Sequence, residues 1–107
     1  MLRRIEQYQT SAGRAPYRDW INRLKDQGVK ARIFTRLDRL SLGNFGKCKA
    51  LGPGISELKI NYGPGYRIYF AEEGAITIIL LCGGDKGAQK KDIEKARCFL
   101  ADYRSRR

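Results

Sequence analysis

Residues 57–86 constrain the fold most, because apolar and polar side chains alternate there with the period of two that is typical of β-strands. The segment reads ELKINYGPGYRIYF, then a short acidic turn, then AITIILLCGGDK. Gly63-Pro64-Gly65 predicts a turn between two antiparallel strands. The apolar run at residues 76–81 predicts a further strand that is covered on both faces in the middle of a sheet.

Helical spacing on either side of this segment predicts three helices. Pro16 favours the start of the first helix, and Gly28 is expected to separate it from the second, which ends at Gly43. The third is expected from Ala88 onward, and its apolar stripe comprises Ile93, Ala96, Leu100 and Tyr103. Strands are expected at residues 2–8, 45–51, 55–62, 66–72 and 75–82.

A group of strands that follows a helical hairpin favours an α+β fold. We expect the hairpin to pack on a mostly antiparallel sheet of four or five strands, with a C-terminal helix after the sheet. A length of 107 residues suits one core, so residues 1–107 are expected to form a single domain.

The charge of the chain favours a polyanionic partner. Lys and Arg number 22, whereas Asp and Glu number 11, so the net charge is +11. A nucleic acid, a ribonucleoprotein or an acidic protein would each complement this surplus, and charge alone does not choose among them.

Histidine and cysteine usage excludes several classes of site. The chain contains no histidine, which excludes Ser-His-Asp and Cys-His nucleophile systems and the paired-histidine chemistry of many ribonucleases. Cys48, Cys82 and Cys98 form no CxxC pair, so we expect reduced core thiols and no metal site. No secretory signal is evident, and the apolar runs are far shorter than the ~20 residues that span a bilayer, which favours a cytoplasmic protein without a membrane segment.

The side chains of the expected hairpin predict its register. One face carries Leu58, Ile60 and Tyr62 on the first strand and Tyr66, Ile68 and Phe70 on the second. Matching these faces pairs Ile60 with Ile68 and leaves Gly63-Pro64-Gly65 as a three-residue loop.

The opposite face of this hairpin is expected to be cationic. In the predicted register Lys59 lies across from Tyr69, and Asn61 lies across from Arg67. Arg67 could hold a phosphate with two hydrogen bonds, and Lys59 could act as a point charge. Truncation of Arg67 on such an open face is expected to leave the fold intact. The alternative is a solvated sheet face whose cations pair with an acid such as Glu57.

Two neighbouring segments add further candidate anion contacts. Lys47 and Lys49 lie on one side of the preceding strand. At the end of the last strand, Gly83-Gly84 allows backbone conformations closed to other residues and can bring backbone amides close to an anion, and Asp85 is a candidate helix cap. Lys86, Gln89 and Lys90 would lie at the positive end of the helix that follows. A simple capped turn from strand to helix fits this spacing equally well.

Together these residues resemble the RelE/ParE superfamily of toxins from bacterial toxin–antitoxin modules, and most closely its HigB-like branch of addiction module killer proteins. The matching segments are Asp19-Trp20, Ala50-Leu51-Gly52, Glu57-Leu58-Lys59-Ile60, Tyr62 to Tyr69, and Leu80 to Lys86, followed by Gln89, Asp92-Ile93 and Ala96. They cover nearly the whole chain.

The resemblance implies a RelE-like fold and a ribosome-dependent mRNA endonuclease that needs no cofactor. In such enzymes the ribose 2′-OH attacks the adjacent phosphate. Arg67, Lys59 and Lys86 would be the catalytic residues, and Lys47, Lys49, Asn61, Tyr69, Gln89 and Lys90 would contact RNA.

The resemblance also implies partners and leaves alternatives. Its partners would be the ribosome, mRNA and a cognate antitoxin with a helix-turn-helix DNA-binding domain, in a complex that can assemble further. Some superfamily members place a functional His or Tyr near the C-terminal end, where this chain offers only Tyr103, so the acid–base assignment stays open. A DNA gyrase inhibitor and a non-toxic binding module with the same fold are the alternatives.

Overall fold

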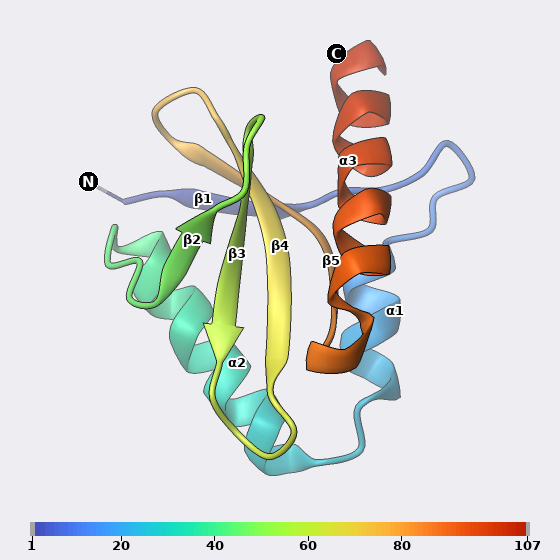
Figure 1. Cartoon of the computed structure of the whole chain (residues 1–107). Coiled ribbons are helices and arrows are strands. Elements are labelled where there is room, and N and C mark those ends of the chain that lie inside the picture. Colours follow the sequence, from blue (N-terminus) through green and yellow to red (C-terminus); the bar gives the residue numbers. More distant parts are fainter. Residues whose placement is uncertain (1, 107) are drawn as a thin grey trace.

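A five-stranded sheet organises the computed structural model, which describes residues 2–106 (Figure 1). Its strands are β1 (Arg4–Gln7), β2 (Cys48–Ala50), β3 (Ile55–Ile60), β4 (Tyr66–Glu73) and β5 (Thr77–Asp85). The spatial order is β1-β5-β4-β3-β2, and only the β1–β5 pair is parallel. This arrangement confirms the α+β fold and the mostly antiparallel sheet.

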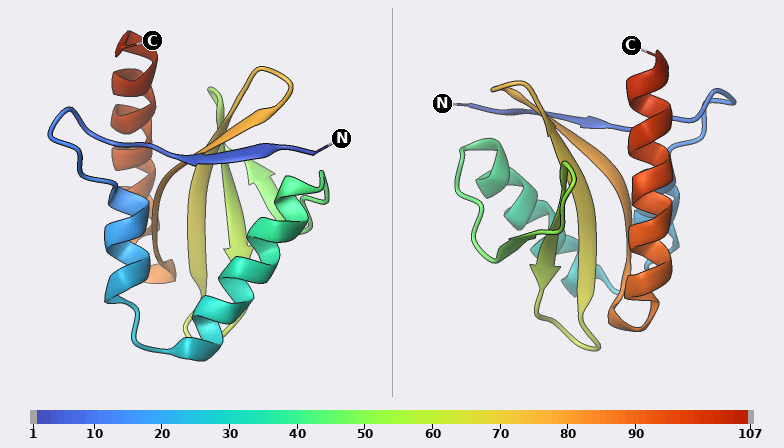
Figure 2. Two further views of the ribbon diagram at one scale, coloured as in Figure 1. Left: turned by 180° about the vertical axis from the view of Figure 1, so that it is seen from behind. Right: turned by 45° about the horizontal axis from the view of Figure 1, so that its top comes forward.

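The helices cover both faces of the sheet. They are α1 (Pro16–Arg23), α2 (Gln27–Ser41) and α3 (Gln89–Arg106), and a short 3₁₀ turn, η1 (Lys86–Ala88), precedes α3. Views from opposite sides show α1 and α2 on one face and α3 on the other (Figure 2). Among residues 2–106, no helix is long and apolar enough to cross a bilayer.

Each face of the sheet has its own apolar core. The core under α1 and α2 includes Trp20, Ile33, Leu58, Ile68 and Phe70, and the core under α3 includes Tyr69, Ile79, Leu81, Ala96 and Leu100. Residues of β5 enter both cores, which explains its near-continuous apolar sequence. Of the three free cysteines, Cys82 is buried as expected, but Cys48 is half-buried and Cys98 is exposed on α3, so the expectation of three core thiols is wrong for Cys98.

Gly28 lies inside a helix, so the expectation that it separates the helices is wrong. α1 already ends at Arg23, and α2 begins at Gln27. The Asp26 side chain caps α2 by accepting hydrogen bonds from the backbone N–H groups of Gly28 (2.8 Å) and Val29 (3.3 Å). A Cβ at position 28 would collide with the Tyr62 hydroxyl. The glycine therefore makes room for the β3–β4 turn against the start of α2.

The β3–β4 register differs by two residues from the predicted one. Lys59 lies opposite Arg67, and Ile60 lies opposite Tyr66 rather than Ile68. The connection consequently spans residues 61–65 instead of three residues. Both glycines of this connection, Gly63 (φ 57°) and Gly65 (φ 90°), adopt left-handed conformations, which allows this longer turn. A shift of two keeps every side chain on its predicted face, so Lys59 and Arg67 still share one.

Gly83 and Gly84 are ordinary strand residues of β5 and do not use the backbone freedom that glycine allows. They lie opposite Ile68 and Arg67, and neither has a positive φ. Their small size serves packing instead. A Cβ at Gly83 would collide with the Trp20 ring, and one at Gly84 would collide with the Asp92 carboxylate. The pair therefore lets α1 and α3 approach the end of β5 closely.

Candidate functional site

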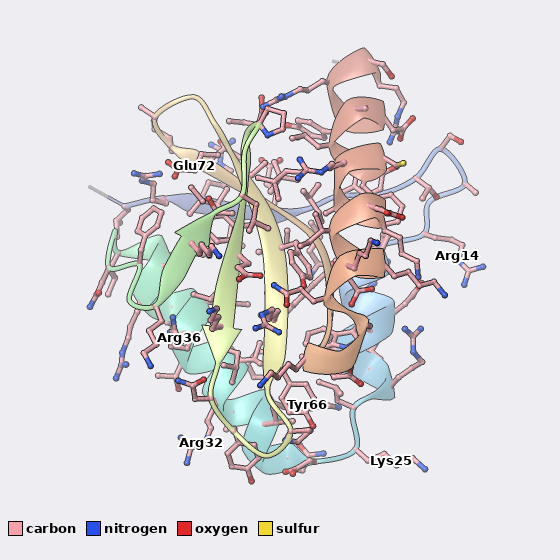
Figure 3. The ribbon with its side chains drawn as sticks, in the orientation of Figure 1. Arg14, Lys25, Arg32, Arg36, Tyr66 and Glu72 are labelled. Carbon is pink, nitrogen blue, oxygen red and sulfur yellow. The ribbon has the colours of Figure 1, made fainter. Side chains whose placement is uncertain are left out.

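A small cationic pocket lies where β3 ends and β4 begins. Its volume is about 210 Å³, and its lining comprises Lys59, Ile60, Asn61, Gly65, Tyr66, Arg67 and Lys86. Tyr66 marks this end of the sheet in Figure 3. Three of the lining residues are cations, and within residues 2–106 no carboxylate lines the pocket. The structure thus brings together the three predicted catalytic residues and Asn61.

Strand pairing and one turn contact assemble this pocket. Lys59 and Arg67 face each other across the β3–β4 ladder, a position in which like charges repel. The backbone N–H of Lys86 donates to the carbonyl of Gly65 (3.1 Å), which holds the end of β5 against the β3–β4 turn. Asp85 caps the 3₁₀ turn by accepting from the N–H of Ala88 (3.2 Å), as expected. Three cations held this closely would favour a bound anion.

A buried carboxylate anchors Arg67 behind the pocket. Glu57 Oε2 lies 3.4 Å from Arg67 Nε, and the side chains are only 1% and 12% exposed. The same oxygen accepts a hydrogen bond from Gln89 Nε2 (3.2 Å), the first residue of α3. Because Glu57 engages the Nε side of the guanidinium, the terminal nitrogens stay available for a ligand in the pocket.

Sequence comparison places the chain in a known family. The family model described as "Phage derived protein Gp49-like (DUF891)" matches residues 19–104, which include α1 from its fourth residue, the whole sheet except β1, and the pocket. The chain belongs to this Gp49-like family. The family is related to the RelE-type toxins of addiction modules, which agrees with the resemblance stated from the sequence.

A second comparison finds a relative in Haemophilus influenzae. The two chains are 46% identical over 83 residues, which is 78% of this chain and 84% of that protein. The relative is described only as an uncharacterized protein, so the match assigns no activity.

Tyr69 does not belong to the open cationic surface of this Gp49-like chain. It is fully buried, because α3 packs across β4 and β5 on the face where an open surface was expected. Burial, together with the nearby Glu57 and Asp92 carboxylates, raises the pKa of the Tyr69 hydroxyl. Residues 59 and 67 stay accessible because they lie beyond the start of α3. The prediction that Tyr69 contacts RNA is therefore wrong for the folded state.

The other predicted RNA contacts of the Gp49-like chain lie around the pocket without lining it. Lys47, which precedes β2, and Lys49 within it are exposed, and Lys49 lies opposite Glu57. Lys90 is exposed in the first turn of α3. Gln89 is half-buried and donates to Glu57, so its side chain has a structural contact.

Glu57 is the residue that sequence reasoning undervalued. The sequence indicates Glu57 only as a possible partner that would make the cations structural. Because Glu57 and Lys59 are two residues apart in a strand pattern, the sequence does predict that they lie on the same face of the sheet. Its burial could not be predicted, since that depends on where α3 begins to cover the sheet.

Proposed function

We propose that this Gp49-like protein is the toxin of a type II toxin–antitoxin module and acts as an endoribonuclease on mRNA at the ribosome. The family and its relation to addiction-module toxins support the toxin assignment. The pocket carries the nuclease assignment, because Lys59, Arg67 and Lys86 surround one space of about 210 Å³ that no carboxylate of residues 2–106 lines. Such a site attracts the RNA backbone and stabilises additional negative charge on a phosphate.

The proposed chemistry is transfer of the phosphate to the neighbouring ribose oxygen. A base removes the proton from the 2′-OH, and the 2′ oxygen forms a bond to phosphorus. The bond from phosphorus to the 5′ oxygen then breaks, and an acid returns a proton to that oxygen. The products are a 2′,3′-cyclic phosphate and a 5′-OH, so no water is consumed. Arg67 stabilises the charge on the phosphorane, and Lys59 and Lys86 are the candidates for base and acid.

The partners follow from the same proposal. The substrate is mRNA on translating ribosomes, and a cognate antitoxin with a helix-turn-helix domain holds the toxin inactive in the cytoplasm. A net charge of +11 favours both an RNA substrate and an antitoxin with an acidic binding segment.

The experiment that tests this function is expression of the protein alone, followed by mapping of the mRNA ends. We expect growth arrest that the antitoxin relieves, together with mRNA fragments that carry 2′,3′-cyclic phosphate and 5′-OH ends. Fragments ending in 3′-OH would contradict the mechanism. Intact mRNA combined with inhibition of DNA supercoiling would favour the gyrase-inhibitor alternative.

A further inference from the structure

A second and larger cationic groove lies between α2 and the end of β3. It encloses about 600 Å³, and its lining comprises Gly28, Ala31, Arg32, Thr35, Arg36, Arg39, Ile60, Asn61 and Tyr62. Three of these residues are arginines, and no acidic side chain from the described part of the chain lines the groove. Figure 3 labels Arg32 and Arg36, which reach this side of the molecule from α2.

The arginines of this groove divide into one structural residue and two available ones. Arg36 donates to the backbone carbonyls of Lys59, Phe45 (3.4 Å) and Lys47 (3.3 Å), so it ties α2 to the edge of the sheet. Arg32 and Arg39 are exposed. Neither is in an ion pair with any carboxylate of residues 2–106. Their charge is therefore free to bind a ligand.

One wall of the groove is an aromatic–guanidinium stack. The Arg32 guanidinium carbon lies 4.7 Å from the centre of the Tyr62 ring. The Tyr62 hydroxyl in turn packs against Gly28, where a Cβ would collide with it. Tyr62 therefore holds Arg32 in position, and a guanidinium plane held in this way is a surface on which nucleic-acid bases stack.

The groove adjoins the proposed catalytic pocket. Ile60 and Asn61 line both spaces, so the two meet at the end of β3. β2 pairs with β3 only through Ser56, Glu57 and Leu58, and one further hydrogen bond joins the N–H of Lys59 to Lys47. Asn61, which follows the last residue of β3 and lines both spaces, is exposed. An RNA strand held in the pocket can therefore pass over Asn61 into the groove.

We propose that this groove binds single-stranded RNA that continues from the catalytic pocket, and this inference rests on the proposed function. Arg32 and Arg39 bind phosphates, and a base next to the cleaved phosphodiester stacks on the Arg32–Tyr62 pair. RNA fits better than an acidic protein segment because the groove combines a stacking surface with two arginines that have no ion pair within residues 2–106, and because it adjoins a second cationic pocket.

Binding of a non-cleavable RNA tests the groove independently of catalysis. The probe is a fluorescent 12-nucleotide RNA that is 2′-O-methylated throughout, measured by fluorescence anisotropy at several salt concentrations. We expect Arg32→Ala/Arg39→Ala to weaken binding at least tenfold. The slope of log affinity against log salt should fall by about 1.4, since each phosphate contact to a single strand contributes about 0.7.

The matched control is Arg18→Ala/Arg23→Ala, which removes the same charge from exposed positions of α1. Its affinity should stay within about twofold of wild type. Equal losses of affinity in both double variants would show that only net charge matters and would overturn the proposal. Unchanged affinity in the groove variant would overturn it as well. Thermal melting of both variants establishes that they are folded.

Two further measurements distinguish a free RNA strand from ribosomal RNA, and an RNA ligand from a protein partner. Cosedimentation with ribosomes that carry no mRNA reports on ribosomal RNA, and the oligonucleotide reports on a free strand. Loss of oligonucleotide binding in the groove variant, with the control variant unchanged, supports the proposal. Loss of ribosome cosedimentation with oligonucleotide binding unchanged would overturn it in favour of a contact with ribosomal RNA. Loss of binding to the purified antitoxin, with both RNA interactions unchanged, would overturn the proposal in favour of a protein-docking surface.

Discussion

At the residue scale, the Glu57–Arg67 pair changes what a substitution at Arg67 means. The expectation that Arg67 could be truncated without harm to the fold is not compatible with its buried partner. Glu57 is fully buried, and its contacts are Arg67 and Gln89. Removal of Arg67 leaves a carboxylate without its charge partner in a dry environment, so a loss of toxicity in Arg67→Ala would not by itself identify a catalytic residue.

We expect Arg67→Ala to lower the free energy of unfolding by about 3–5 kcal/mol, which is typical when one partner of a buried ion pair is removed. The double variant Glu57→Gln/Arg67→Gln should recover most of this loss, because neither charge remains. Urea unfolding of both variants and of wild type measures the effect. If Arg67→Ala is as stable as wild type, Glu57 tolerates burial without a charge partner, which would contradict this expectation.

Asp92 is a second buried carboxylate at the residue scale. It is only 7% exposed, and its Oδ2 atom has no hydrogen-bond partner within residues 2–106. Burial raises its pKa above the ordinary 3.8, the neighbouring Asp85 acts in the same direction, and Lys95 and Lys91 act against it. The folded state therefore binds this proton more tightly than the unfolded chain does.

We expect this group to lower stability as the pH rises from about 3.8 towards the raised pKa, because the unfolded chain releases the proton first. Above the raised pKa the penalty is complete and constant. Asp92→Asn cannot ionise, so its stability relative to wild type should increase with pH across this window. Urea unfolding at a series of pH values measures the difference, and a difference that does not change with pH would contradict the assignment.

At the element scale, sequence patterns predicted the helices and strands better than the register and packing between them. The stripe of α3 and the apolar run of β5 are confirmed, since each reflects periodicity along one segment. The β3–β4 register shifted by two because the turn uses two left-handed glycines, and apolar alternation cannot distinguish registers that differ by two. The roles of Gly28 and Gly83 could not be predicted from local patterns, because each glycine makes room for a side chain distant in the sequence.

The packing at Gly83 gives an element-scale prediction. Gly83→Ala places a methyl group against the Trp20 ring, so α1 must move away from β5. We expect a loss of about 1–3 kcal/mol, the usual cost of overpacking a core. The control is Gly87→Ala, where the nearest neighbour of a Cβ is Asp85 Oδ1 at 3.4 Å. Thermal melting compares the two, and equal stability would show that α1 adapts without cost.

At the scale of the whole molecule, the fold divides one sheet face between a core and a site. α3 covers the part that contains Tyr69 and ends its cover near Glu57, which leaves Lys59 and Arg67 accessible. The sequence predicted the cations and their shared face. It could not predict the division, because that depends on where a helix from the end of the chain crosses the sheet. For the same reason Lys86 joined the pocket while Gln89 became a structural contact.

The most direct test of the central claim is the rate of mRNA cleavage in a reconstituted translation reaction by wild type, Arg67→Lys and a matched control. Arg67→Lys keeps a cation beside Glu57 and removes only the planar guanidinium. The control is Arg3→Lys, whose arginine pairs with Glu72 (2.8 Å) away from the pocket. We expect wild type and Arg3→Lys to cleave equally and Arg67→Lys to be about 10²-fold slower. Wild-type cleavage by folded Arg67→Lys, or intact mRNA with wild type, would contradict the account.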